Sequence, residues 1–361
     1  NFMKRKFLIL LLILCFSAST IACNFHEFAQ KGDYSQSNLD QGASNEREGP
    51  NQTSNTVFQS NASVSLVANI TSPKVGDAKM FCNKIAAGSD GELVLFNTDG
   101  TVYKKFSNIP VNWLYPSEDD MIIVSGSFNH QILLTEFDDD FEIKNSKVLF
   151  DNTNLLIDPT ITKYNDIWIL TYIEINGTVN NSNPDAENGL YTVHCYTSSD
   201  LSEWTLVSDI ISCKNNIEDG DLVINNDIFY YIFEKESYDK GPSSLEVISS
   251  KDHGVTWENK KTIISNDSDN ELASVFPTSS GYSLYYSSDV QNPGKSYDGA
   301  SVYCANLKND FSMENTYEIP LDETNGILLY DVVRKDRDCY FLYSQNYITK
   351  NNLLLKKISL K

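Results

Sequence analysis

Residues 157–172, IDPTITKYNDIWILTY, are the stretch from which the fold of this chain can be inferred, because the sequence repeats them. Residues 158–172 align without a gap on residues 219–233, an offset of 61 positions that pairs Asp158 with Asp219. Looser copies occur at residues 271–286, 112–124 and 329–343. A near-constant period of this kind indicates a repeated supersecondary unit.

Each copy has the pattern of two strands joined by a tight turn. Runs rich in Ile, Trp, Tyr and Phe flank Asn, Asp or Gly. A second strand pair follows each copy, and four strands per repeat are the content of a propeller blade. No window has a sustained apolar spacing of 3.6 residues, which argues against a helical repeat. The sequence therefore predicts an all-β propeller.

Five blades are preferred, and six are the alternative. The five expected blades are residues 112–150, 155–212, 217–265, 271–320 and 327–361. The last of these ends after a third strand, and a propeller has to close its ring to avoid an open sheet edge. We expect the missing strand to come from the N-terminal side, either residues 64–70 or part of residues 80–106.

The first 23 residues predict a signal peptide. Basic residues 4–6 precede the apolar run 7–16, which as a helix would span about 15 Å, against about 30 Å for a bilayer core. The ending Thr-Ile-Ala-Cys at residues 20–23 resembles a bacterial lipobox, which implies that Cys23 is lipidated. Ordinary secretion with cleavage after Ala22 is the alternative. Residues 24–63, rich in Ser, Asn and Gln, predict a disordered linker, and residues 64–361 the propeller domain.

The charge of the chain restricts its partners. With 49 acidic and 28 basic side chains, the formal net charge is −21, which argues against nucleic acid and anionic membrane surfaces as partners. We expect an extracellular monomer, attached to the cell membrane through its N-terminal lipid or else secreted. Beyond Cys23 the cysteines have no metal-ligand spacing, so we predict no cysteine metal site and favour buried thiols over disulfides. These cysteines are Cys82, Cys195, Cys213, Cys304 and Cys339.

Two turns resemble known propeller hairpins. Residues 250–257, SKDHGVTW, resemble the Asp-box of sialidases and other propellers. In such a turn Asp252 would accept hydrogen bonds from turn amides, Gly254 would permit a positive φ, and Trp257 would anchor the return strand. Residues 198–204, SSDLSEW, resemble a hairpin common in five-bladed glycosidases. Both turns indicate the fold and are silent about chemistry.

The candidate site lies where the innermost strands of a propeller converge, at one mouth of the central channel. The residues that open the repeats should line this mouth, and most of them carry carboxylates. Clustered carboxylates raise one another's pKa, so that one stays protonated as an acid while another remains ionised. The catalytic candidates are Asp158, Asp219, Asp221 and Glu271, and the substrate-binding candidates are Glu218, Asp331, Trp113 and Tyr115. Alternatively, the carboxylates are solvated strand-start residues of an acidic chain, and the two aromatic residues belong to the core.

The pair Asp158-Pro159, followed by an apolar strand, a polar turn and an aromatic strand, resembles the Asp-Pro motif of glycoside hydrolase family 43. Residues 271–276 and 281–287 resemble the strand of that clan that carries its catalytic Glu, although Ala273 and Ser274 replace a Pro and a His. The resemblance implies a five-bladed hydrolase of polysaccharides or oligosaccharides that contain arabinose, xylose, galactose or fructose. It implies Asp158 as the base, Asp219 or Asp221 as the residue that tunes the acid, and Glu271 as the acid. If Asp158 is instead the tuning residue and Glu218 the acid, only Asp77 is available as the base two repeats upstream. It implies no cofactor other than a structural calcium ion in the channel.

Three other functions are alternatives to hydrolysis of such sugars. A carbohydrate-binding propeller without catalysis shares every feature of the site, and a purely structural role would need no glycan. An exo-sialidase is disfavoured because it needs three arginines, whereas residues 64–361 contain only Arg334 and Arg337. A Ser-His-Asp hydrolase or a zinc enzyme is disfavoured because the domain's histidines are unpaired in the repeat pattern.

Overall fold

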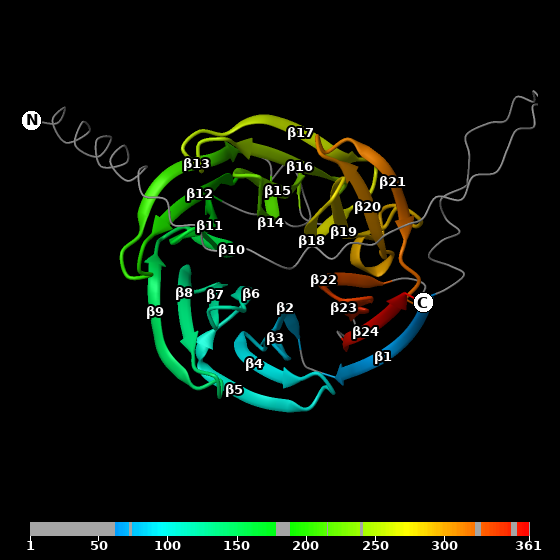
Figure 1. Cartoon of the computed structure of the whole chain (residues 1–361), viewed down its shortest axis with the longest axis horizontal. Helices are drawn as coiled ribbons and strands as arrows, with labels where there is room; N and C mark the ends of the chain where they lie inside the picture. Colours follow the sequence, from blue (N-terminus) through cyan, green and yellow to red (C-terminus); the bar gives the residue numbers. More distant parts are fainter. Residues whose placement is uncertain are drawn as a thin grey trace, which may run out of the picture. The chain divides into compact units, whose positions relative to one another are not determined.

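The computed structural model describes residues 62–71, 74–177, 188–214, 216–238, 241–321, 326–347 and 352–360, all of which belong to one compact unit, residues 52–361. Six four-stranded antiparallel sheets stand as blades around a central axis (Figure 1). The predicted propeller is confirmed, but the preferred count of five blades is wrong. The predicted signal peptide, Cys23 and all of the predicted linker except Ala62 and Ser63 lie outside the described residues.

The blades follow one another along the chain, and each runs from an inner to an outer strand. Blade 1 contains β2 (Val75–Phe81), β3 (Lys84–Ser89), β4 (Glu92–Asn97) and β5 (Val102–Pro110). Blade 2 contains β6 (Trp113–Ser117), β7 (Ile122–Ser127), β8 (Gln131–Phe137) and β9 (Ile143–Asp151). Blade 3 contains β10 (Leu155–Tyr164), β11 (Ile167–Asn176), β12 (Leu190–Ser198) and β13 (Thr205–Cys213).

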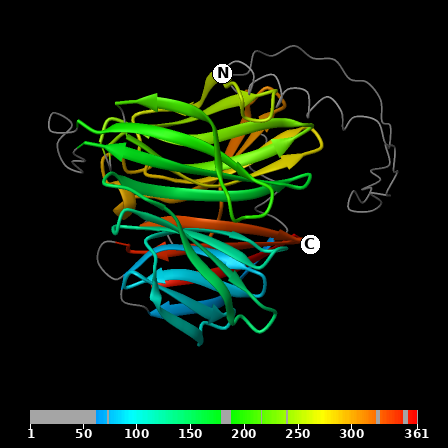
Figure 2. The ribbon, with the colours of Figure 1, turned by 90° about the vertical axis from the view of Figure 1, so that its left-hand side faces the viewer.

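The second half of the ring repeats this arrangement. Blade 4 contains β14 (Asn216–Asn225), β15 (Ile228–Glu236), β16 (Ser243–Ser250) and β17 (Glu258–Ser265). Blade 5 contains β18 (Asn270–Thr278), β19 (Gly281–Ser288), β20 (Ser301–Lys308) and β21 (Met313–Glu318), with the 3-10 helix η1 (Ser296–Asp298) between β19 and β20. Blade 6 contains β22 (Ile327–Lys335), β23 (Asp338–Gln345), β24 (Asn352–Leu360) and β1 (Ala62–Thr71). In the side view, the outer strands β9 and β13 face the viewer (Figure 2).

Strand β1 closes the ring. It pairs with β24 in antiparallel register, from Ala62 opposite Leu360 to Thr71 opposite Asn352. The closing strand is therefore residues 64–70 with short extensions, as predicted, and not part of residues 80–106. Those residues belong instead to the blade that was missed. Its inner strand β2 begins at Val75, before the range considered, and its short strands turn tightly at Asp90 (φ 52°) and Gly91 (φ 76°).

The core is divided among the six interfaces between neighbouring blades. Each interface has its own cluster of buried hydrophobic side chains drawn from two adjacent sheets. Between blades 4 and 5, for example, Ile232 and Leu245 pack with Leu284, all with no measurable exposure. The inner strands are thus fixed from both sides.

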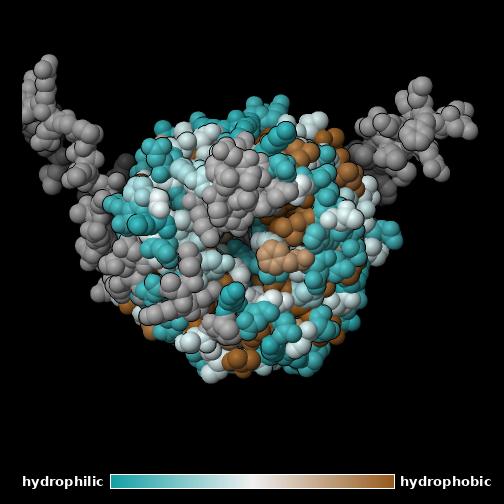
Figure 3. Space-filling view, turned by 180° about the vertical axis from the view of Figure 1, so that it is seen from behind, coloured by the Kyte–Doolittle hydropathy of each residue, from teal (hydrophilic) through white to brown (hydrophobic). Residues whose placement is uncertain are grey.

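On the face opposite to that of Figure 1, hydrophilic side chains cover most of the coloured surface, and hydrophobic ones gather beside a central hollow (Figure 3).

The turn at residues 250–257 is held by its own polar groups. Asp252 accepts hydrogen bonds from the amide of Thr256 (2.8 Å) and from its hydroxyl (2.7 Å). Gly254 has a φ of 88°, and the indole of Trp257 donates to the carbonyl oxygen of Gly254 (3.1 Å). The indole also donates to Ser208 of blade 3 (3.1 Å), so the turn links two blades.

The five cysteines of the described residues are free thiols. Cys195 and Cys304 are buried, whereas Cys82 is exposed. Burial was the wrong expectation for Cys82, because the apolar run before it ends at a hairpin turn where its φ is 56°. No helix among the described residues has the length and apolar character needed to cross a membrane.

Candidate functional site

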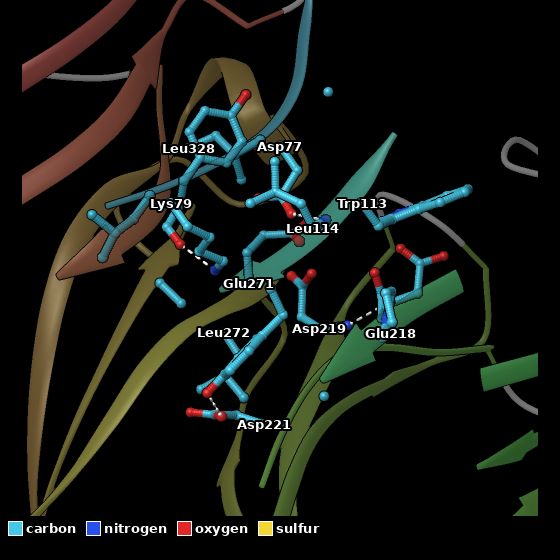
Figure 4. A pocket seen from close by; sticks show the side chains of 18 of the residues that line it. Asp77, Lys79, Trp113, Leu114, Glu218, Asp219, Asp221, Glu271, Leu272 and Leu328 are labelled. Atoms are coloured by element: carbon cyan, nitrogen blue, oxygen red, sulfur yellow. Dashed lines mark hydrogen bonds between the residues drawn. The ribbon is translucent and has the colours of Figure 1, made fainter. Parts of the chain in front are cut away.

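A cavity of about 170 Å³ opens where the inner strands converge (Figure 4). Carboxylates from blades 1, 3, 4 and 5 line it, together with one lysine and several aromatic rings. The acidic lining residues are Asp77, Asp158, Glu218, Asp219, Asp221 and Glu271. All four catalytic candidates therefore share one cavity, together with the substrate-binding candidates Glu218, Trp113 and Tyr115.

Asp331, the remaining candidate, lies elsewhere. It lines a second cavity of about 200 Å³, which shares Lys79, Tyr115 and Asp221 with the first and also contains Glu118. Asp331 therefore lines the channel wall away from the mouth. Asp331 lies on β22 directly after a register shift between Leu329 and Asp331. The sequence pattern did not indicate this shift.

Irregular strand pairing turns the acidic side chains toward the channel. In β10 the register shifts between Ile157 and Thr160, and in β14 between Glu218 and Asp221. Asp158 (φ 46°) and Asp219 (φ 51°) take the left-handed conformation, which Asp tolerates better than most residues. The same irregularity in β2 surrounds Asp77. The repeat aligned in the sequence thus contains a repeated bulge, which holds Asp158 in β10 and Asp219 in β14.

Several of these side chains bind the backbone of the next blade. Asp77 accepts a hydrogen bond from the amide of Leu114 (2.8 Å), and Asp158 accepts one from the amide of Asp219 (3.0 Å). Asp331 accepts one from the amide of Met80 (2.7 Å). These bonds connect blade 1 to 2, blade 3 to 4 and blade 6 to 1. These three carboxylates therefore help to hold neighbouring blades together.

Lys79 places a positive charge in the channel, and it was not among the residues predicted from the sequence. It is half-buried, lines both cavities and donates a hydrogen bond to the carbonyl oxygen of Tyr330. Burial lowers the pKa of Lys79, but the surrounding aspartates outweigh this effect and leave the pKa above its ordinary value. The aspartates are Asp77, Asp331, Asp219 and Asp221. A lysine within an apolar-polar alternating strand carries no signal of its own, whereas Asp77 had been named from the sequence as the base of the alternative assignment.

This lysine bears on the calcium ion that the resemblance implies for the channel. The ammonium group of Lys79 already balances the charge of the four aspartates. A calcium ion bound among them would be repelled by this group. The residues along the axis therefore do not fit a channel calcium ion.

Burial and the repulsion between carboxylates raise the pKa of two of the catalytic candidates. Burial, and then the charge of Asp219, raise the pKa of Asp158 well above its usual range. Burial, and then the charges of Glu234 and Asp269, do the same for Glu271. Oxygens of Asp219, Glu234 and Glu271 lie within 4.8 Å of one another, so these groups cannot all be ionised without a counter-charge.

Aromatic side chains flank the acidic cavity. Trp113 is partly exposed at its rim and meets Phe128 edge to face, with ring centroids 5.1 Å apart. Phe128, at the turn after β7, is 64% exposed and was not among the candidates. Tyr115 instead points into the channel, where its hydroxyl donates to Asp221 (3.0 Å), so it lines the wall between the two cavities. Of the two predicted aromatic residues, Trp113 contacts another aromatic ring, whereas Tyr115 is bonded to a carboxylate of the wall.

No protein-family model matches the sequence, and no curated protein matches it in sequence. The fold is similar to that of an α-L-arabinofuranosidase from Fusarium graminearum solved with an iminosugar inhibitor, with a TM-score of 0.58 and 12% identity over 82% of this chain and 98% of that one. It is also similar to an α-L-arabinanase from Penicillium chrysogenum in complex with arabinobiose, with a TM-score of 0.54, 12% identity and the same coverage. At this identity the comparison shows a shared propeller fold.

A further structure of the Fusarium graminearum enzyme is described as a family GH93 α-L-arabinofuranosidase with arabinobiose, and it has a TM-score of 0.57 and 11% identity over the same shares of the chains. The resemblance to family 43 rested on the motif around Asp158, on residues 271–276 and 281–287, and on an expected five blades. The six blades observed here do not agree with the expected five.

Proposed function

We propose that this protein is a glycoside hydrolase that acts outside the cell on a polysaccharide or oligosaccharide containing arabinose. The observation that carries the proposal is the convergence of carboxylates from separate blades on one open cavity, with oxygens of Asp219 and Glu271 within 4.8 Å of each other. The arabinose substrate is suggested by the similar propellers, which are described as an arabinofuranosidase and an arabinanase. The predicted signal peptide would direct export, and a lipid on Cys23 would hold the enzyme at the cell surface.

In this proposal Asp219 and Glu271 form the reacting pair. Glu271 gives its proton to the glycosidic oxygen as the bond to the anomeric carbon breaks, and the carboxylate of Asp219 forms an ester with that carbon. Glu271 then takes a proton from a water molecule, whose oxygen displaces Asp219 and restores both groups. Carboxylates of retaining enzymes are about 5–5.5 Å apart, against about 6.5–9.5 Å in inverting ones, so the observed proximity favours retention.

Asp158 takes a different role from the base that the resemblance implies. Its carboxylate accepts the amide hydrogen of Asp219 at 3.0 Å, which holds that residue in its left-handed conformation. We therefore assign Asp158 to the positioning of Asp219. Asp221 is engaged by the hydroxyl of Tyr115 and lies toward the second cavity, so it contributes to the charge of the wall.

A carbohydrate-binding propeller without turnover is the second candidate. It is favoured by the hydrogen bonds that tie Asp77, Asp158 and Asp331 to backbone amides of neighbouring blades, because those carboxylates serve the architecture. Trp113 and Phe128 would then provide the sugar contact. Sialidase activity has no support in the site, because Arg334 is exposed and stacks on Phe276, 4.8 Å from the ring centroid.

Hydrolysis of arabinan, of xylan and of an aryl α-L-arabinofuranoside tests the proposal. We expect release of arabinose with retained configuration, and loss of at least about a hundredfold in kcat for Asp219→Asn and Glu271→Gln. Asp338→Asn is the matched control, because Asp338 binds Lys357 and Ser359 on the outer part of blade 6. Glycan binding without turnover in the unmodified protein, unchanged in both site variants, would establish the binding propeller instead.

A further inference from the structure

A second acidic group lies beside the channel, between blades 4 and 5. Glu234 and Glu236 extend from the end of β15, and Asp269 immediately precedes β18. One oxygen from each of these three carboxylates lies within 4.8 Å of the others. The three side chains are 2%, 5% and 4% exposed, so water reaches them little. We call these three residues the interblade triad.

The triad contains an oxygen that no donor satisfies. Within the described part of the chain, Oε2 of Glu234 is buried and accepts no hydrogen bond, and no lysine, arginine or histidine forms a salt bridge with Glu234. Asn216, 1% exposed, lies against the triad, with Nδ2 donating to Oε1 of Glu236 (2.7 Å) while its own Oδ1 has no donor. Burying a carboxylate oxygen without a partner costs free energy. Oε2 of Glu234 therefore indicates that the triad binds a positive charge.

We propose that Glu234, Glu236 and Asp269 bind one calcium ion that joins blade 4 to blade 5. Two oxygens bound to the same Ca²⁺ at about 2.3–2.6 Å can lie at most about 4.6–5.2 Å apart, and the observed limit of 4.8 Å meets this condition. Three carboxylates offer six oxygens, and Asn216 offers a neutral one nearby. Glu234, Glu236 and Asp269 do not line the cavity that contains Lys79. Glu234 also has an oxygen within 4.8 Å of oxygens of Asp219 and Glu271, so the calcium site adjoins the proposed reacting pair.

The ligand set selects the ion. All donors are oxygens, and no histidine or cysteine belongs to the triad, which favours Ca²⁺ over zinc and copper. Mg²⁺ prefers to keep several waters in an octahedral shell, which an enclosed triad of carboxylates does not provide. The framework around Asp269 is also fixed, since its amide donates to Asp289 (2.9 Å), which in turn accepts the amides of Lys295 (2.9 Å) and Ser296 (2.8 Å).

Calcium titration of the EDTA-treated full chain tests the site. By isothermal titration with CaCl2 we expect one ion per chain, and we expect the melting temperature to rise by several degrees in CaCl2 but not in MgCl2. Glu234→Gln should weaken calcium binding at least tenfold and abolish the thermal shift. In EDTA this variant should melt at or above the temperature of the unmodified protein, because it removes one of three repelling charges.

Asp269→Asn is the second variant, and Glu246→Gln is the matched control. Glu246 lies on β16 of the same blade with a side chain 8% exposed, but it is paired with Lys260 at 2.8 Å and should leave calcium binding unchanged. The proposal is overturned if the unmodified protein binds no calcium, if MgCl2 gives the same shift as CaCl2, or if both triad variants bind calcium like the unmodified protein. The readout is metal binding, so it is independent of whether the protein hydrolyses a glycan.

Discussion

Replacing Lys79 by Met should destabilise the propeller by removing the cation of its channel. The substitution keeps most of the side-chain stem but leaves Asp77, Asp331, Asp219 and Asp221 without their shared counter-charge. Breaking a fully buried ion pair by removing one partner costs about 3–5 kcal/mol. Because Lys79 is half-buried and borders two cavities, we expect a smaller loss of about 2–3 kcal/mol, or roughly 4–12 °C in melting temperature.

The pH dependence of this loss identifies its cause. Burial raises the pKa of Asp77 and Asp331, while Lys79 lowers both. Carboxyl groups with raised pKa bind protons more readily in the folded state, so their unfavourable contribution grows as the pH rises from the unfolded pKa through the folded one. Without Lys79 the folded pKa values rise further. The Lys79→Met loss should therefore be largest near pH 7 and shrink as the pH falls toward 4.

Thermal and urea unfolding at pH 7 and at about pH 4.5 provide the measurement. Lys105→Met is the control, since Lys105 forms an exposed ion pair with Glu92 and should change the melting temperature little. The reasoning is refuted if Lys79→Met unfolds like the unmodified protein at pH 7. It is also refuted if the loss is equal at both pH values, because a charge effect must depend on the ionisation of the aspartates.

Three further changes probe other parts of the structure. Gly220→Ala should destabilise the domain by about 1–3 kcal/mol in urea unfolding, because the added Cβ would lie 1.7 Å from Oη of Tyr231, and an unchanged midpoint would contradict this packing. Asp252→Ala should cost about 1 kcal/mol by freeing the amide and the hydroxyl of Thr256 while glycan turnover stays the same, and a loss of turnover would assign this turn a role in the site. Phe128→Ala should weaken affinity for a bound sugar about three- to tenfold without lowering the melting temperature, because the ring is exposed beside Trp113, and unchanged affinity would exclude that platform.

The alignment of the sequence repeats located some residues of the candidate site but not others. Asp158 and Asp219 were found because the alignment placed them in register, and both occupy equivalent bulges. Lys79 was missed because its charge is balanced by four aspartates from three blades. Of these aspartates, only Asp77 is near Lys79 in the sequence. Glu234, Glu236 and Asp269 were missed for the same reason, since Asp269 precedes β18 and is 33 positions from Glu236 in the sequence.

The sequence by itself determined the class of fold, since strand-length apolar runs, tight turns and a repeat period suffice to specify four-stranded blades. It also determined that the closing strand comes from the N-terminal side, because the last repeat is one strand short. The tertiary structure decided the number of blades, since blade 1 resembles the others in its hydrogen-bond pattern more than in its residues. It also decided the electrostatics, because the pKa of a buried group depends on charges that only the closed ring brings within a few ångströms.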